Sequence, residues 1–190
     1  SDTPHLFKDS ALNGSCENYF FDIRDRHRLQ STIQSINPSI VFHLAAQPIV
    51  LESYASPIKT LETNILGTSY LLDSLKTCTN VKHILIITSD KCYSNTTETT
   101  TPFVEDCALG GLDPYSASKA CQDIISQAFY ASYFKQKNVG LTTIRAGNII
   151  GGGDWAQDRI IPDCARAIQN NSPITLRNPN SIRPWQYILD

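Results

Sequence analysis

The sequence predicts an α/β protein built on a parallel, doubly wound sheet. Short runs rich in β-branched residues alternate with longer helical runs along the 190 residues, as strand–helix–strand repeats do. The central strands are almost continuously apolar, as in SIVFHLA (39–45) and VKHILIIT (81–88), which is typical of parallel strands buried on both faces. We therefore expect helices over both faces of the sheet.

The first half of the chain supplies four of these elements. Pro57 suits the first turn of a long helix, where a backbone N–H has no partner to lose, and Ser56 is a suitable N-cap. In order, we expect a strand at 18–23, a helix at 26–36, a strand at 39–45 and a helix at 57–78.

The second half continues the alternation. Asp113 is a good N-cap and Pro114 suits the first helical position, so a second long helix is expected to begin there. The Thr-rich stretch at 94–103 is expected to be a surface loop. The predicted elements are strands at 81–88, 139–146 and 173–177, and helices at 114–136 and 160–170.

Composition excludes several classes of function. The net charge is −2 and no run of Lys or Arg occurs, so no nucleic-acid or anionic-membrane footprint is present. No stretch approaches the ~20 apolar residues of a membrane span. The six Cys are spread singly, which indicates reduced thiols in a cytoplasmic setting, and the four His are isolated, so no metal site is expected.

Candidate chemistry lies where the predicted strands end, because doubly wound sheets carry their sites at the carboxyl ends of the strands. The strand at 81–88 is followed by Ser89, Asp90 and Lys91. This triplet is either a solvated turn or an acid/base cluster. In the second case the hydroxyl binds a substrate oxygen, and the carboxyl and amine transfer protons.

A Tyr and a Lys four residues apart open the second long helix. Residues with this spacing share a helix face, so Tyr115 and Lys119 are stacked near the strand ends. A neighbouring ammonium lowers the pKa of a tyrosine, which makes the pair a workable base for an alcohol. Tyr133 and Lys137 repeat the spacing at the far end of the helix, where a surface pair is the expected reading.

A Ser that ends a buried strand, followed by a helix that opens with YxxxK, resembles the extended short-chain dehydrogenase/reductase family, which acts on nucleotide sugars. The resemblance implies a Rossmann-like, doubly wound fold with NAD as cofactor. FDIRD, VFHLAAQ and ETNILGT resemble the family's cofactor segments, and RAGNIIGGGDW resembles a loop that faces the nucleotide sugar. The implied NAD-binding residues are Asp22, Ile23, Leu44, Ala45, Ala46, Asn64, Tyr115 and Lys119.

Within this family, SDKCY, GGGDWAQDRIIPD and RNPNSIRPWQ resemble the CDP-glucose 4,6-dehydratase subgroup. The resemblance implies that Tyr115 takes a proton from the C4 hydroxyl, with Ser89 bound to that oxygen. Lys119 would hold the ribose, Lys91 would remove the C5 hydrogen, and Asp90 would protonate the departing C6 hydroxyl. The product would be a 4-keto-6-deoxy sugar nucleotide for O-antigen or another cell-surface polysaccharide.

The resemblance also implies partners and further binding residues. CDP-glucose is the expected substrate, and a homodimer through helices 57–78 and 114–136 is the expected assembly. Asn148 would face the nucleotide sugar, while Arg183 and Arg159 are candidates for its diphosphate. Another sugar-nucleotide dehydratase or an epimerase is the nearest alternative function, and a truncated, non-catalytic relative is the second.

One part of the family pattern is not found. No glycine-rich phosphate-binding turn precedes Asp22, and GGGD at 151–154 lacks its spacing. We expect residues 1–150 to be the central and later part of an NAD-binding domain, and 151–190 to begin a small substrate-binding portion. Such a central fragment, with the first β-α-β unit absent, is expected neither to bind NAD tightly nor to turn over alone.

Overall fold

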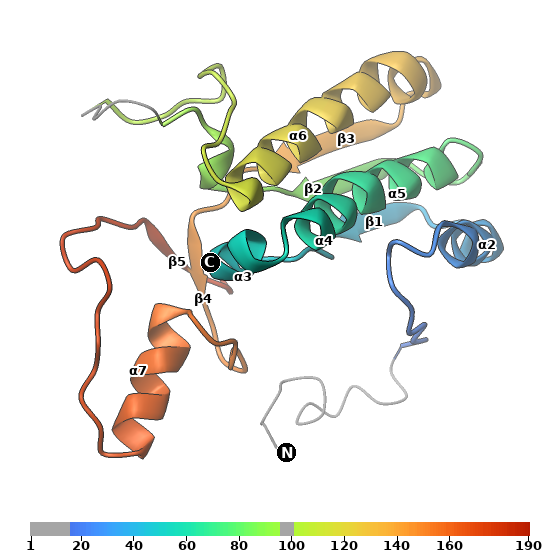
Figure 1. The fold of residues 1–190 in the computed structure, drawn as a ribbon. Coiled ribbons are helices and arrows are strands. Elements are labelled where there is room, and N and C mark those ends of the chain that lie inside the picture. The colour runs from blue at the N-terminus through green and yellow to red at the C-terminus, as the bar shows by residue number, and fades with distance from the viewer. Residues whose placement is uncertain (1–15, 96–100) are drawn as a thin grey trace. The chain divides into compact units, whose positions relative to one another are not determined.

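The computed structural model describes residues 16–95 and 101–190. The chain divides into two compact units, which Figure 1 shows with their elements labelled. One is Phe20–Ala146. The other comprises Gly147–Asp190 and the first residues of the chain, of which 16–19 are described. Part of the predicted loop at 94–103 lies outside the described residues.

A three-stranded parallel sheet forms the centre of the unit Phe20–Ala146. Its strands are β1 (Ile40–His43), β2 (His83–Ile87) and β3 (Gly140–Ile144), in the order β1-β2-β3. Ile40 lies opposite His83, and His83 lies opposite Gly140. The predicted parallel sheet is confirmed, and each strand is shorter than its predicted range.

The first two described helices stand before and after β1 in the chain. Helix α2 (Arg26–Ile36) matches its predicted range. The Asp25 side chain caps its start by accepting from the Arg28 N–H, and Asn37, in the left-handed conformation, ends it. Helix α3 (Val50–Ala55) was not predicted. It stands just before Ser56, in the loop that leaves β1.

Both predicted long helices contain a π-helical turn. The first consists of α4 (Pro57–Leu61), the π-turn η1 (Glu62–Leu66) and α5 (Gly67–Leu75). The second consists of α6 (Pro114–Phe129), the π-turn η3 (Tyr130–Phe134) and the 3-10 turn η4 (Lys135–Lys137). A π-turn inserts one residue into the helical ladder and so changes which side chains face the neighbouring helix.

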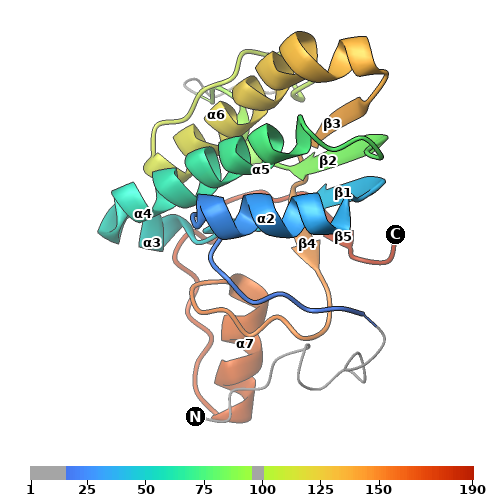
Figure 2. The ribbon, with the colours of Figure 1, turned by 90° about the vertical axis from the view of Figure 1, so that its right-hand side faces the viewer.

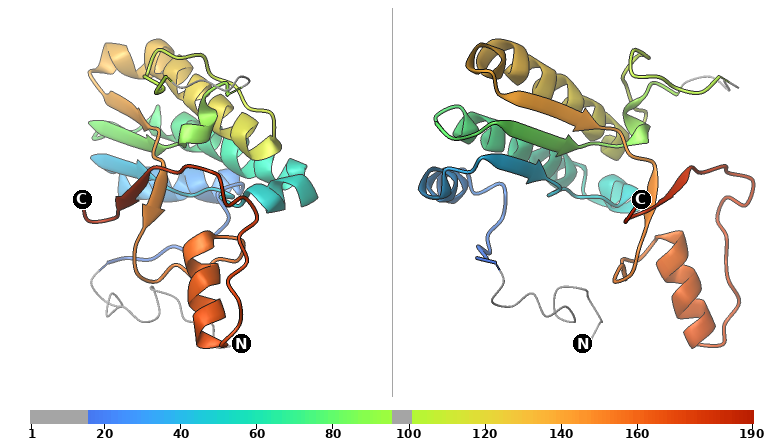
Figure 3. Two further views of the ribbon diagram at one scale, coloured as in Figure 1. Left: turned by 90° about the vertical axis from the view of Figure 1, so that its left-hand side faces the viewer. Right: turned by 180° about the vertical axis from the view of Figure 1, so that it is seen from behind.

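Helices α2, α4, α5 and α6 lie over one face of this sheet (Figures 2 and 3). The core lies between them and the strands, where Leu72 and Leu75 of α5 and Ile84 and Ile86 of β2 are almost fully buried. The other face carries exposed side chains such as Phe42. Within the described residues, helices therefore cover one of the two faces for which they were predicted.

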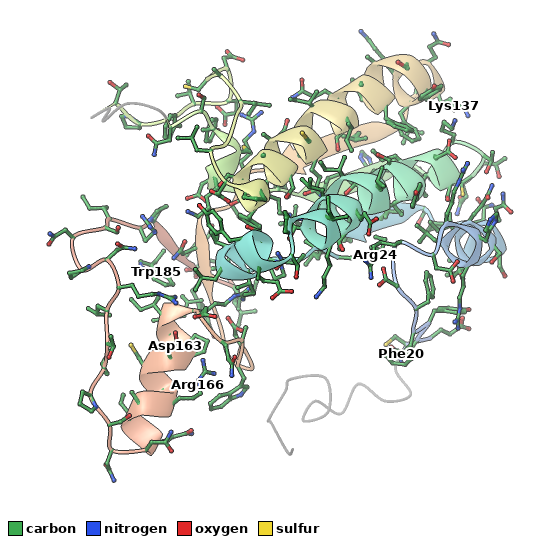
Figure 4. All side chains as sticks on the ribbon, in the orientation of Figure 1. Phe20, Arg24, Lys137, Asp163, Arg166 and Trp185 are labelled. Carbon is green, nitrogen blue, oxygen red and sulfur yellow. The ribbon has the colours of Figure 1, made fainter. Side chains whose placement is uncertain are left out.

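The unit Gly147–Asp190 holds two short parallel strands and a helix. Strand β4 (Asn148–Ile150) pairs with β5 (Trp185–Tyr187), and neither strand was predicted. Helix α7 (Ile160–Gln169) confirms the prediction at 160–170. Its Arg166 contacts Asp163 through an ion pair and donates to the carbonyl of Trp155 (Figure 4).

Two predicted strands are absent. Residues 18–23 and 173–177 form no strand in the structure. A strand exists only through a ladder with a neighbour, and neither segment has such a ladder among the described residues. Phe21 and Ile23 pack against the core instead.

Candidate active site

The Ser-Asp-Lys triplet forms a hydrogen-bonded turn at the end of β2. Residues Asp90–Cys92 are a single 3-10 turn, η2, and Ser89 caps it by accepting from the Lys91 N–H at 3.2 Å. The Ser89 hydroxyl donates to Asp90 Oδ1 at 3.0 Å. The Asp90 N–H donates to the carbonyl of Ala146, beyond the end of β3, at 3.0 Å. The hydroxyl and the carboxylate are therefore in contact, while Lys91 is exposed.

Helix α6 begins beside this turn. Asp113 caps the helix by accepting from the Ser116 N–H at 2.9 Å, and Pro114 is its first residue, as predicted. The segment before the helix returns to η2, because the Gly110 N–H donates to the Cys92 carbonyl at 2.9 Å. Gly111 is required where this segment passes the start of α6, since a Cβ atom there would lie 2.5 Å from the backbone of Ser116. Helix α6 and η2 are thus packed together.

Tyr115 and Lys119 are buried in the first two turns of α6, with exposures of 8% and 3%. The Lys119 ammonium donates to the carbonyl of Ile87, the last residue of β2, at 3.1 Å. It also donates to Gln122 Oε1 at 2.9 Å. Burial lowers the pKa of Lys119 to about 8. A cation that titrates near neutral pH beside a buried tyrosine is typical of an acid/base site.

The second Tyr–Lys pair makes a different set of contacts. Lys137 lies at the far end of the second long helix (Figure 4), where its ammonium donates to the Lys76 carbonyl at 2.6 Å. The Lys76 ammonium lies 4.6 Å from the centre of the Tyr133 ring. The pair joins two helix ends at the surface, and Tyr133 is 44% exposed.

The loop after β1 is held by Asn64. Its Oδ1 accepts from the Gln47 N–H at 2.8 Å, and its Nδ2 donates to the Gln47 carbonyl at 3.1 Å and to Ser118 Oγ at 2.8 Å. Asn64 is fully buried in the π-turn η1, so it contacts the loop and α6 at once. Leu44 and Ala45 are exposed and Ala46 is half-buried. Asn64 therefore fixes a loop whose preceding residues remain accessible.

Asp22 stands at the edge of a pocket of about 350 Å³ that Arg24, Glu62, Leu66 and Tyr70 also line. Hydrogen bonds from the Arg24 guanidinium and N–H hold the pKa of Asp22 at about 2. Its neighbour Ile23 packs on Gly67, where a Cβ atom would lie 2.8 Å from the Ile23 side chain.

The three candidate substrate residues belong to the unit Gly147–Asp190. The Asn148 N–H, in β4, donates to the Pro184 carbonyl at 2.9 Å. Arg159, at the start of α7, pairs with Asp154 at 2.9 Å. Arg183 is exposed and donates to the adjacent carbonyl of Ile182 at 2.9 Å.

A buried ion pair near the site was not predicted. Arg145, after β3, donates to both carboxylate oxygens of Asp123 on α6, at 2.8 and 3.2 Å. It also donates to the Glu105 carbonyl at 2.7 Å and lies 5.0 Å from the Tyr93 ring centre. Burial alone would raise the pKa of Asp123, but the hydrogen bonds from Arg145 and Gln127 outweigh it and the pKa is lowered. The sequence does hold one signal for this pair, because Asp123 is a charged residue one helical turn after Lys119.

A second unpredicted group consists of Gln122, Thr68 and His43. The Gln122 amide lies between the Lys119 ammonium and the Thr68 hydroxyl, and the Thr68 hydroxyl contacts His43 Nε2 at 2.8 Å. Burial, followed by the charge of Lys119, lowers the pKa of His43 to about 4. No local pattern in the sequence marked any of these three residues.

Within the described residues, no group of three or more His, Cys, Asp or Glu side chains could hold a metal ion. No helix in the described part of the chain is long and apolar enough to cross a membrane.

Comparison with known proteins gives a consistent set of relatives. Residues 2–190 match the GDP-mannose 4,6 dehydratase family. The chain is 48% identical to a CDP-glucose 4,6-dehydratase of Salmonella typhimurium, over 98% of this chain and 53% of the relative. It is 31% identical to a dTDP-D-glucose 4,6-dehydratase of Dictyostelium discoideum, over 90% of this chain and 41% of the relative. The chain thus spans about half the length of the curated relatives it matches.

Solved structures share the fold. A UDP-glucose 4-epimerase of Thermotoga maritima, solved with UDP-glucose, superposes with a TM-score of 0.80 at 21% identity, over 89% of this chain and 54% of that one. A dTDP-glucose 4,6-dehydratase of Streptomyces venezuelae, solved with NAD, gives 0.78 at 23% identity, over 93% and 52%. At these identities the likeness establishes the fold alone, and that fold is the predicted NAD-binding α/β architecture.

Proposed function

Because the chain belongs to the GDP-mannose 4,6-dehydratase family, we propose that its protein is an NAD-dependent nucleotide-sugar 4,6-dehydratase that acts on CDP-glucose. One observation carries the proposal: the Ser89–Asp90 hydrogen-bonded turn, with Lys91 beside it, packs against the helix start that buries Tyr115 and Lys119. The 48% identity to a CDP-glucose 4,6-dehydratase supports the choice of nucleotide and sugar.

The residues present fit a bound NAD. A carboxylate held ionised at Asp22 suits the adenosine end of the dinucleotide. The loop Leu44–Ala46, whose next residue Gln47 is fixed by Asn64, leaves Leu44 and Ala45 exposed for contact along it. Lys119 retains an N–H for a ribose hydroxyl, and Ile23 packs beside Asp22 on Gly67. When bound, NAD supplies a reversible hydride acceptor for the sugar.

The side chains have distinct roles in the proposed reaction. Tyr115 accepts the proton of the C4 hydroxyl, Ser89 donates a hydrogen bond to that oxygen, and Lys119 stabilises the phenolate of Tyr115. Once C4 is a ketone, the C5 hydrogen is acidic. Lys91 removes that proton, and Asp90 gives one to the departing C6 hydroxyl, so that one water leaves. CDP-glucose becomes water and CDP-4-keto-6-deoxyglucose, with no net oxidation.

We assign the nucleotide sugar to residues of the smaller unit. Asn148 would contact the sugar nucleotide, and Arg183, which is exposed and free of any ion pair among the described residues, would bind its diphosphate. Arg159 can contribute only if it leaves Asp154, so it is the weaker ligand. In this proposal residues 151–190 begin the substrate-binding portion.

Homodimerisation through the two long helices is part of the proposal. Apolar residues on their surfaces are exposed in the single chain, and Ile58 of α4 and Ile124 of α6 are 65% and 52% exposed. A dimer interface on these helices would remove such exposed apolar side chains from water. The six free cysteines suit a reducing, cytoplasmic compartment, and the product suits the synthesis of deoxy sugars for O-antigen or other surface polysaccharides.

The proposed activity is tested with the full reading frame that contains residues 1–190. The protein is incubated with NAD and CDP-glucose, and 4-keto product is followed by its absorbance in alkali, with dTDP-glucose and GDP-mannose in parallel. We expect product from CDP-glucose. Exclusive formation of a C4-epimerised sugar would instead identify an epimerase, and no turnover of any sugar would favour a non-catalytic relative.

A further inference from the structure

A chain of buried hydrogen bonds leads away from Lys119. Its ammonium donates to Gln122 Oε1 at 2.9 Å, and Gln122 Nε2 donates to Thr68 Oγ1 at 2.8 Å. The Thr68 hydroxyl in turn contacts His43 Nε2 at 2.8 Å. Gln122 and Thr68 are fully buried and His43 is 3% exposed. Helix α6, helix α5 and strand β1 thus share one polar chain that ends at the proposed catalytic lysine.

The direction of each hydrogen bond is fixed by chemistry. An ammonium only donates, so the carbonyl end of Gln122 must face Lys119 and the NH₂ end must face Thr68. The Thr68 hydroxyl donates to the Asn64 carbonyl at 2.7 Å, so its oxygen accepts from both Gln122 and His43. His43 therefore carries a proton on Nε2, and burial, which lowers its pKa to about 4, keeps the ring neutral near pH 7. Reversal of the Gln122 amide would place two donors against each other at Lys119 and two acceptors against each other at Thr68.

The number of N–H groups on the ammonium limits what Lys119 can bind. An ammonium has three N–H groups. Among the described residues, two of them are used by the Ile87 carbonyl and by Gln122, at 3.1 and 2.9 Å. One N–H remains for a hydroxyl of a ligand or of Tyr115, and its direction is set by the other two bonds.

We propose that Gln122 is a positioning residue: its amide, locked by Thr68, fixes the Lys119 ammonium so that its remaining N–H meets the cofactor ribose and the Tyr115 oxygen. The expected change in kcat rests on the proposed function, whereas the expected change in NAD affinity does not. No part of the sequence pattern around YxxxK assigns this role to a residue three positions after the lysine.

The charge of Lys119 is sensitive to this arrangement. Burial lowers its pKa to about 8, so a lost acceptor would lower it further and a new carboxylate would raise it. The other titratable groups that interact with it are His43 of β1 and Cys92 of η2, and Tyr115 lies one turn before it. Asp123, one turn after it, is already paired with Arg145.

The first test compares Gln122→Met with Gln122→Glu in the full reading frame. Met keeps the volume and removes both polar ends, whereas Glu keeps an acceptor for Lys119. Gln127→Met is the matched control, because it makes the same change on the same helix at an exposed position and removes a hydrogen bond to Asp123 in place of the one to Lys119. Calorimetry measures the NAD dissociation constant, which we expect Gln122→Met to raise roughly 10- to 100-fold. Gln127→Met should stay within about threefold of the wild type. Gln122→Glu keeps the acceptor for Lys119 but loses the donor to Thr68, so its dissociation constant should lie between those of the wild type and Gln122→Met.

The second readout is the pH profile of kcat. If the charged Lys119 is required, the alkaline limb should move to lower pH in Gln122→Met and to higher pH in Gln122→Glu, by roughly half a unit or more. A purely structural role would lower kcat at all pH values and leave the limb in place. Equal losses in both variants with unmoved limbs, or NAD affinities equal to that of Gln127→Met, would overturn the proposal.

A third variant protects the test against misfolding. Thr68→Val keeps the side-chain shape and removes the hydroxyl that locks Gln122, so it should weaken NAD binding in the same direction as Gln122→Met, by a smaller factor. If Gln122→Met does not fold, unchanged NAD affinity in Thr68→Val refutes the role of Gln122. If the wild type binds NAD but converts no sugar, the proposed dehydratase function fails, while the affinities still decide on Gln122.

Discussion

Replacement of Asp123 by Asn should strongly destabilise the protein. The variant keeps the volume of the side chain and removes only its charge. The Asp123 side chain is fully buried and that of Arg145 is 12% exposed, and the guanidinium contacts both carboxylate oxygens. Loss of one partner leaves a buried cation without its counter-ion.

The magnitude follows from this burial. Loss of one member of a buried pair costs about 3–5 kcal/mol, and because Arg145 retains some exposure and its bond to the Glu105 carbonyl, the lower end, about 3 kcal/mol, is expected. With a urea m-value of about 2 kcal/mol/M, the midpoint of unfolding should fall by roughly 1.5 M. The matched control is Glu52→Gln, which breaks the exposed pair with Lys59 and should cost less than about 1 kcal/mol.

Equilibrium urea unfolding, followed by circular dichroism, measures both variants. The difference between wild type and Asp123→Asn should also shrink as the pH falls below about 4. The pKa of Asp123 is lowered in the folded state, so its stabilisation is present above the unfolded pKa and is lost as the pH falls through the folded value. A cost below about 1 kcal/mol at pH 7, or a cost equal to that of Glu52→Gln, would refute this account of the pair.

Three further predictions concern buried groups of the site. The wild type should lose about 3 kcal/mol of stability as the pH falls from 6.5 to 4, because His43 binds a proton in the unfolded chain before it does so in the folded one. His43→Asn should abolish this loss, and an unchanged pH dependence would contradict the prediction. The wild type should gain stability between pH 8 and about 10.5, because Lys119 loses its proton in the folded state before it does so in the unfolded chain. Lys119→Met should remove this gain, which thermal unfolding measures. Gly67→Val should destabilise by about 1–3 kcal/mol and weaken NAD binding by displacing Ile23, whereas equal NAD affinity would show that Ile23 does not contact the cofactor.

The parts of the fold that depend on local pattern could be predicted. The apolar runs gave the three parallel strands, and the Asp113–Pro114 cap gave the first residue of α6. The strands predicted at 18–23 and 173–177 are absent because strand formation needs a neighbour, which no local window contains. The π-turn that holds Asn64 has no local signature either.

Some contacts of the candidate site could likewise be predicted from the sequence, and others could not. Ser89 and Asp90 are adjacent in the sequence, and Tyr115 and Lys119 share a helix face, so their grouping could be inferred from spacing. The contact between Gln122 and Thr68 joins residues 54 positions apart, and no sequence pattern near either residue predicts it. Long-range polar contacts of this kind are visible only once the helices are packed.

The central claim is that oxidation and reduction occur at different carbons of one sugar. Its most direct test is to incubate the full reading frame with NAD and CDP-glucose that carries deuterium at C4, and to locate the label in the product by NMR. We expect a 4-keto-6-deoxy sugar nucleotide with the deuterium at C6. Deuterium that is found again at C4, in a sugar that keeps its C6 hydroxyl, would contradict the assignment of this protein as a 4,6-dehydratase.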